Sequence, residues 1–416
     1  MESSASLVLA KHALLMFGIV LAAGTISGLI ARLMRIPDVV LFLVAGMLLG
    51  PGVTGLVNIR ADSAINQLIL IFGSSYILFD GGASIRLGVL KEVWVTILVI
   101  STLGVLITAA ITGVAAYYFL GVAPIVALLL GAVLASTDPA TLVPIFKQIR
   151  IRERVAQTVI SESAFNDAMG AILTFAVLSV AMGAGEFSAG TAILELFQQS
   201  LLGISIGVSL GYLAAFFIAH EKFGFLAEFA PVVTLMAVIG AYMAADGMQA
   251  SGFMAVFVFG IMLGNRKSLG FKLSRRENGQ LQEYAMTTSF IMRMFIFILL
   301  GTQVDFSLMK PYLYGGVAVV TVFMLVARPV TVFICALPDR RAKWSLKELL
   351  FICWTRETGV IPGALAGMLV GMKAPGATII VSVTFIAILM TLMIQATTTR
   401  WLAKQLDLLA EEPGQH

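Results

Sequence analysis

Residues 131–167 read GAVLASTDPATLVPIFKQIRIRERVAQTVISESAFND, and the polar positions in this stretch decide the fold. Two apolar runs meet here across a short basic segment, and each carries polar side chains well inside it. The first run contains Ser136-Thr137-Asp138-Pro139. A proline removes a backbone N–H and its ring collides with the carbonyl one turn earlier, so Pro139 predicts a break in that helix. The stretch therefore predicts two neighbouring helices, the first of them interrupted.

The rest of the chain is equally apolar. Of 416 residues, 59% are hydrophobic and 12% are charged, whereas soluble domains are about 25% charged. Too few polar residues are present to cover a soluble surface, which predicts an all-α polytopic membrane protein in a lipid bilayer. The net charge of +4 forms no basic run with interleaved aromatic residues, so we expect no nucleic-acid partner.

Histidine and cysteine are scattered through the chain. His12, His220 and His416 are far apart, and Cys335 and Cys353 fall in apolar segments. This pattern lacks the clustered ligands and nucleophiles of metal sites and membrane proteases. We therefore expect no catalytic residues, no enzyme activity and no cofactor.

Apolar runs of about 20 residues predict about 13 transmembrane helices. They cover approximately residues 7–31, 39–57, 64–83, 93–119, 124–147, 155–182, 191–219, 229–245, 249–265, 285–302, 312–337, 347–371 and 376–399. Lys and Arg concentrate in alternate connections, and the opposite connections hold only Lys11, Arg60, Lys310 and Lys373. This bias predicts an outside N-terminus and a cytoplasmic C-terminus. The short tail after Arg400 favours one membrane domain over 1–416, without a soluble regulatory domain.

Ionisable side chains inside the predicted spans indicate functional sites, because inserting each one into the hydrocarbon region costs a free energy of at least about 2.5 kcal/mol. Those in or at the edges of spans are Asp80, Asp138, Glu162, Asp167, Asp246, Arg293, Arg328, Arg356 and Glu357. Asp246 lies at the outer end of its span, where water reaches it, and Arg293 has no evident partner. The remaining charges are the candidates for transport chemistry.

The densest group of these charges predicts a cation site. Ser163 and Asp167 are four residues apart and share one face of a helix, and a broken helix nearby offers carbonyl oxygens to a dehydrated cation. Asp167 lies about twelve residues from the inner end of its span, or roughly 18 Å along it, near the membrane midplane. Glu162 faces elsewhere and needs a counter-ion, for which both Arg328 and Arg356 lie at a suitable depth.

A second interruption occurs in the run 347–371, where residues 356–363 read RETGVIPG. It lies seven predicted spans after the first interruption and crosses in the opposite direction. Interrupted helices 5 and 12 at corresponding positions of two halves indicate two inverted-topology repeats, which are typical of secondary transporters.

At these residues the sequence resembles the NhaP-type sodium/proton antiporters, in the Asn-Asp branch of the monovalent cation/proton antiporter superfamily. The resemblance rests on Thr137-Asp138-Pro139, on Glu162-Ser163-x-x-Asn166-Asp167, on Phe79-Asp80-Gly81-Gly82, on Ala327-Arg328 and on the segment containing Arg356. Two positions depart from the family pattern. Asp80 stands where Glu is frequent, which weakens its case as a direct ligand, and Glu357 stands where Gly is usual, which favours Arg328 as the partner of Glu162.

The resemblance implies a homodimer in the cell (inner) membrane that serves pH homeostasis. Its dimerisation part would be about 1–85 and 190–305, and its core transport part, about 90–185 and 310–405, would move across the membrane like an elevator. Na⁺ and H⁺ would bind Asp167 in turn, with Ser163 and the Thr137 carbonyl as further Na⁺ ligands and with Asp138 and Asp80 contributing. The structural support would come from Asn166, Glu162, Arg328, Arg356 and Pro139.

The expected function is exchange of Na⁺, with Li⁺ or K⁺ as alternatives, against protons. Asn166 cannot titrate, so a single carboxylate predicts electroneutral one-for-one exchange. The competing interpretations are a potassium/proton antiporter of the same family and a sodium-coupled solute symporter. The sequence does not rank the alkali cations.

Overall fold

A computed structural model describes residues 5–34, 36–60, 63–137, 142, 145, 146, 149, 151–183, 189–220 and 223–409. Over these residues the regular structure is helical, apart from an isolated antiparallel bridge between Ile151 and Leu409. This confirms the all-α prediction.

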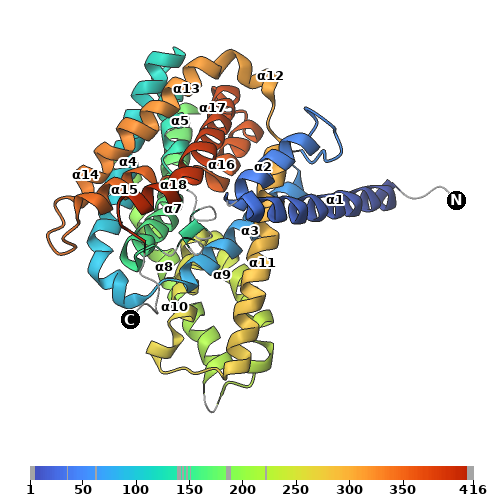
Figure 1. The fold of residues 1–416 in the computed structure, drawn as a ribbon, viewed down its shortest axis with the longest axis vertical. Helices are drawn as coiled ribbons and strands as arrows, with labels where there is room; N and C mark the ends of the chain where they lie inside the picture. Colours follow the sequence, from blue (N-terminus) through green and yellow to red (C-terminus); the bar gives the residue numbers. More distant parts are fainter. Residues whose placement is uncertain are drawn as a thin grey trace.

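The helices follow one another through the whole described chain (Figure 1). Their bounds are α1 Ala5–Met34, α2 Asp38–Leu49, α3 Ala64–Ala83, α4 Leu87–Leu120, α5 Pro124–Leu134, α7 Glu153–Ala181, α8 Ala189–Ala219, α9 Ala230–Gly247, α10 Gly252–Gly264, α11 Arg275–Thr302, α12 Phe306–Met309, α13 Leu313–Val322, α14 Arg328–Ala336, α15 Leu346–Trp354, α16 Val360–Gly371, α17 Ala377–Met390 and α18 Thr397–Gln405. Two π-helical segments, η4 Phe323–Ala327 and η5 Thr391–Ala396, join α13 to α14 and α17 to α18.

Fewer helices cross the membrane unaided than the thirteen runs predict. In the described part of the chain, nine helices are long and apolar enough to do so. The other predicted runs contain shorter apolar helices, α2, α5, α10 and α16. Proline or glycine borders three of these helices: Pro37 and Gly50 flank α2, Gly264 is the last residue of α10, and Gly359 precedes α16. Helix α5 begins at Pro124 and ends at Leu134.

Two of the short helices end in the middle of apolar runs, where the sequence predicts interruptions. Helix α5 stops at Leu134, and Ser136 and Thr137 are not helical. Helix α15 stops at Trp354, and the five residues before α16 are non-helical and buried. Pro139 lies outside the described residues. Backbone groups freed inside a membrane domain need partners, so both interruptions are potential binding surfaces.

The helices pack in two regions (Figure 1). In the view of Figure 1, α8, α9, α10 and much of α11 occupy the lower half, whereas α4, α5 and α13 to α17 occupy the upper half. Helix α1 projects from the side, and most of its surface is uncovered by the rest of the chain. Two large clusters of buried hydrophobic residues match this arrangement, one centred on α8 to α10 and the other spread over α2, α4, α5, α7 and α11 to α18.

A polar contact fastens α4 to the loop after α14. The Asp339 carboxylate accepts hydrogen bonds from the Thr96 hydroxyl at 2.6 Å and from the Thr96 N–H at 3.1 Å. Burial raises the pKa of Asp339, but these bonds and those from the Ala342 and Arg341 N–H groups outweigh it, so the pKa lies below its ordinary value. A depressed folded-state pKa stabilises the fold above the unfolded pKa, and that contribution is lost as the pH falls through the folded pKa.

Glycines allow α2 and α11 to touch backbone to backbone. A Cβ placed on Gly46 would lie 2.1 Å from the carbonyl oxygen of Ile298, and one on Gly301 would lie 2.3 Å from that of Leu43. Only glycine fits at both positions without moving one helix from the other.

We expect Gly301→Ala to destabilise the protein by about 1–3 kcal/mol or more, because the added methyl group meets a backbone atom that cannot turn aside. Thermal unfolding in detergent measures the effect. Gly240→Ala in α9 is the matched control, since nothing lies within 4 Å of its added Cβ. Equal melting temperatures for the two variants would contradict the close contact.

Candidate functional site

The centre of the candidate site is an ion pair between α7 and α14. The Arg328 guanidinium donates two hydrogen bonds to the Glu162 carboxylate, both at 2.7 Å. Its Nε–H donates a third at 3.0 Å to the carbonyl of Ile352 in α15. Both side chains are almost fully buried. Two parallel N–H···O bonds are the strongest geometry for such a pair, and they let both charges remain buried.

The backbone around Arg328 is unusual. The π-helical segment η4 ends at Ala327, so Arg328 opens α14 directly after it, with Pro329 next. Single π-helical turns occur often at functional positions because they turn a side chain out of the regular helical register. Of the two arginines that the sequence offers to Glu162, Arg328 makes the contact.

Asn166 joins this ion pair to the end of α5. Its side-chain N–H groups donate to Glu162 at 3.1 Å and to the Thr137 hydroxyl at 2.8 Å. Its carbonyl oxygen accepts the Thr137 backbone N–H at 2.9 Å. The Thr137 hydroxyl in turn donates to Ser163 at 2.8 Å. All four side chains are buried, so one amide fixes the non-helical residues after α5 against α7.

Asp167 lies beside this network, fully buried on α7. The Ser136 hydroxyl donates a hydrogen bond to its Oδ1. Gly170, one turn along α7, permits the approach, because a Cβ there would lie 2.8 Å from the Ser136 Cβ. Ser136 is absent from the sequence-based candidates, although its place beside Thr137 in a polar stretch could have indicated it. Asp138 and Pro139 lie outside the described residues.

Arg356 has a different position from Arg328. It lies two residues after the end of α15. Its guanidinium donates a hydrogen bond to the carbonyl of Ala135, just past the last residue of α5. The same group lies 5.0 Å from the centre of the Phe323 ring. A positive charge at a helix C-terminus is favourable because the last carbonyls carry partial negative charge. Arg356 therefore holds the interruption in α15–α16 against the interruption after α5.

Glu357 follows Arg356 and is fully buried at the same interruption. It is the carboxylate that departs from the family pattern. It is a further buried carboxylate beside the interrupted helices, in addition to Glu162 and Asp167 of α7.

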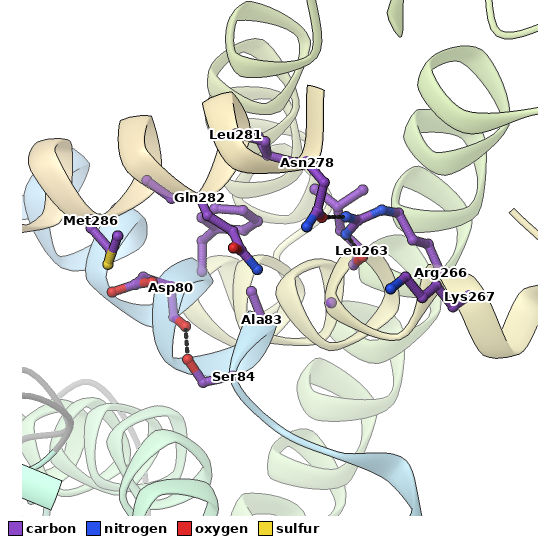
Figure 2. A pocket seen from close by; sticks show the side chains of 13 residues that line it. Asp80, Ala83, Ser84, Leu263, Arg266, Lys267, Asn278, Leu281, Gln282 and Met286 are labelled. Carbon is purple, nitrogen blue, oxygen red and sulfur yellow. Dashed lines mark hydrogen bonds between the residues drawn. The ribbon is translucent and has the colours of Figure 1, made fainter. Parts of the chain in front are cut away.

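Asp80 lies in a separate cavity of about 440 Å³ (Figure 2). Figure 2 shows Asp80 of α3 and Ser84, the residue after α3, on one side. Arg266 and Lys267, which follow α10, and Asn278 and Gln282 of α11 also line the cavity. Asp167, Ser163 and Thr137 do not line this cavity. The Arg266 guanidinium donates to the Asn278 side-chain oxygen, and burial lowers the pKa of Arg266.

Arg293, which has no partner in the sequence analysis, has one in the structure. Its guanidinium lies 3.5 Å from the carboxylate of Asp38, the first residue of α2. The two side chains are 13% and 12% exposed. Sequence analysis missed Asp38 because it borders a predicted span, where water is the expected partner.

A membrane-spanning helical fold with interrupted helices around buried carboxylates defines the class of secondary transporters. The comparisons agree. The family described as "Sodium/hydrogen exchanger, transmembrane" matches residues 18–405. The chain therefore belongs to the sodium/hydrogen exchanger family and is a multi-pass membrane protein, a monovalent cation/proton antiporter and not an enzyme. These findings confirm the predictions of an NhaP-like antiporter and of cation and proton as substrates.

Individual relatives place the chain near the NhaP antiporters. It is 31% identical over 361 residues to "Na(+)/H(+) antiporter 1" of Methanocaldococcus jannaschii, covering 84% of this chain and 81% of the relative. It is 28% identical to "K(+)/H(+) antiporter NhaP" of Alkalimonas amylolytica, covering 94% of this chain and 66% of that protein. The solved structure of the sodium proton antiporter MjNhaP1 from Methanocaldococcus jannaschii at pH 8 is similar, with a TM-score of 0.75, 29% identity, and 95% and 98% of the two chains covered.

The geometry predicts unequal roles for the two arginines. Arg328→Met should cost about 3–5 kcal/mol of stability, because it leaves the Glu162 carboxylate buried without its partner. Arg356→Met should cost less, about 1–3 kcal/mol, because it mainly leaves a backbone carbonyl unsatisfied. Thermal unfolding in detergent ranks the two variants.

The double variant Glu162→Gln with Arg328→Met separates the ion pair from simple packing. It removes both charges, so it should be more stable than Arg328→Met alone. A lower melting temperature for Arg356→Met than for Arg328→Met would reverse the assignment.

Proposed function

We propose that the chain exchanges Na⁺ for H⁺ one for one, with both ions binding Asp167 in turn. The observation that carries this proposal is the division between two buried carboxylates on α7. Glu162 is neutralised by Arg328 at 2.7 Å. Asp167, five residues later, accepts a hydrogen bond from the neutral Ser136 hydroxyl beside the interruption after α5. The position of Asp167 beside this interruption suits a carboxylate that exchanges a proton for a cation.

The proposed cation shell uses oxygen atoms around Asp167. Asp167, Ser163 and the Thr137 carbonyl are the Na⁺ ligands, with Asp138 contributing. The hydrogen bond from Thr137 to Ser163 supports this set, because it holds both ligands on the same side of α7. Hard cations such as Na⁺ select oxygen ligands of this kind. Asp80, which lines a separate cavity, contributes only indirectly, without joining the ligands around Asp167. Asn166, Glu162, Arg328, Arg356 and Pro139 support the site.

Exchange follows from competition at Asp167. Burial favours the protonated carboxyl, whereas a cation surrounded by oxygen atoms favours the ionised form, so the two ions exclude each other. Asn166 adds no titratable group beside it. One carboxylate therefore carries one proton or one monovalent cation, and the exchange is electroneutral.

The proposed architecture has about thirteen spans, nine long ones and the four shorter apolar helices, in two inverted repeats. A dimerisation part, about 1–85 and 190–305, would be shared by a homodimer, and a core part, about 90–185 and 310–405, would carry the ion across. The interruptions after α5 and between α15 and α16 support this symmetry. The basic connections support a cytoplasmic C-terminus and an outside N-terminus in the cell membrane.

The potassium/proton antiporter is the second candidate function. The similarity to the K(+)/H(+) antiporter of Alkalimonas amylolytica favours it, and the same carboxylate and carbonyl ligands would bind K⁺. Dye-monitored exchange in proteoliposomes with Na⁺, Li⁺ and K⁺ over a pH series distinguishes the cations. A flux that requires an organic solute would instead indicate a sodium-coupled symporter.

Asp167→Asn should abolish cation-driven proton movement in proteoliposomes, because the amide binds neither the proton nor the cation strongly enough to exchange them. The variant should keep its melting temperature within a few degrees, since Asn accepts the hydrogen bond from Ser136 equally well.

The matched control is Asp246→Asn, which makes the same chemical change at an exposed position in the last turn of α9. It should exchange ions like the wild type. Retained exchange by a folded Asp167→Asn would overturn the site assignment.

A further inference from the structure

A second cavity, of about 560 Å³, lies where α1, α2, α11 and α18 meet. Most of its wall is apolar, and Pro37 and Phe290 are among the side chains that line it. Two guanidinium groups also line it, from Arg32 in α1 and from Arg400 in α18. The cavity is separate from the proposed ion site, because Asp167, Ser163 and Thr137 do not line it.

Among the residues that the structure describes, no carboxylate balances the charge of these two arginines. In the part of the chain that the structure describes, neither Arg32 nor Arg400 forms an ion pair with a carboxylate. One acidic residue, Asp38, lines the cavity. Its carboxylate accepts the Val39 N–H at 2.9 Å and lies 3.5 Å from Arg293, so its charge is already balanced.

The position of the cavity along the helices matches a lipid headgroup. Arg32 lies in the last turn of α1, and Arg400 lies near the end of the span that includes α18. Trp401, next to Arg400, is 63% exposed, and exposed tryptophans mark the interface between membrane and water. Ile26 and Leu29, on the same helix as Arg32, present an apolar surface that the rest of the described chain leaves exposed.

We infer that this cavity binds the phosphate group of an anionic phospholipid. Arg32 and Arg400 hold the phosphate from opposite sides, and an acyl chain lies along the apolar surface of α1. Guanidinium groups bind phosphate oxygens through paired hydrogen bonds. Basic pockets between transmembrane helices at the cytoplasmic side are typical sites for anionic headgroups. In the orientation proposed above, the lipid belongs to the cytoplasmic leaflet.

A second copy of the chain fits the cavity less well than a lipid does. The residues of α1, Ala5–Met34, include no Asp or Glu, and neither do those of α18, Thr397–Gln405. A copy that packed through either helix would therefore bring no carboxylate to the two arginines. A phospholipid supplies both the negative charge and the apolar chain.

The test measures the melting temperature of delipidated protein in neutral detergent after addition of phosphatidylglycerol, phosphatidylcholine or inorganic phosphate. We expect phosphatidylglycerol to raise the melting temperature of the wild type by several degrees more than phosphatidylcholine does. The double variant Arg32→Gln with Arg400→Gln should lose most of this difference. The conservative variant Arg32→Lys with Arg400→Lys should keep part of it, because the charges remain.

The matched control is Arg341→Gln with Lys404→Gln, which removes two exposed charges that do not line the cavity. It should respond to phosphatidylglycerol like the wild type. An equal response by the Arg32→Gln with Arg400→Gln variant would overturn the proposal. So would a response to inorganic phosphate as large as that to the lipid, or a lipid response that only follows a change from monomer to dimer. None of these outcomes depends on ion exchange, so failure of the lipid proposal would not contradict the proposed function.

Discussion

The ion pair between Glu162 and Arg328 is the constraint on which the rest of the site depends. A carboxylate and a guanidinium buried in a membrane domain are tolerated only when each satisfies the other and its remaining hydrogen bonds are made. Here two hydrogen bonds of 2.7 Å join Arg328 to Glu162, and the Arg328 Nε–H donates a third hydrogen bond to the Ile352 carbonyl. It fixes α7, α14 and α15 relative to one another, and through Asn166 it also fixes the non-helical residues after α5.

The ion pair also gives two neighbouring carboxylates different environments. Glu162 is paired with the guanidinium of Arg328. Asp167 accepts a hydrogen bond from the Ser136 hydroxyl beside the interruption after α5. Arg356 contributes in another way, because it binds the end of α5 and brings the two interruptions together. In the proposed function, Glu162 is the structural charge and Asp167 the transport charge, five residues apart on one helix.

Much of this arrangement can be predicted from the sequence. The low charge content and the long apolar runs predict a helical membrane protein, and Pro139 and the segment from Arg356 to Gly363 predict where helices are interrupted. Burial of Glu162 predicts an arginine partner. Depth alone could not choose between Arg328 and Arg356, because the choice depends on the π-helical turn before Arg328 and on how α14 and α15 pack.

Other features depend on the folded chain. The pairing of Arg293 with Asp38 joins residues far apart in sequence, and Asp38 lies at a helix start where solvent is the expected partner. The lengths of α2, α10 and α16 depend on where glycine and proline border each helix, and apolar runs alone overestimate the lengths of these helices and of α5. The cavity between Arg32 and Arg400 likewise exists only after α1 and α18 come together.

In the proposed mechanism, one carboxylate, Asp167, exchanges one proton for one monovalent cation. The most direct measurement is the number of protons released when Na⁺ or K⁺ binds the purified protein in weakly buffered detergent solution, followed with a pH-sensitive dye. One-for-one competition predicts release of about one proton per bound cation at a pH well below that at which the site is half protonated. Cation binding without proton release, or with two protons per cation, would contradict it.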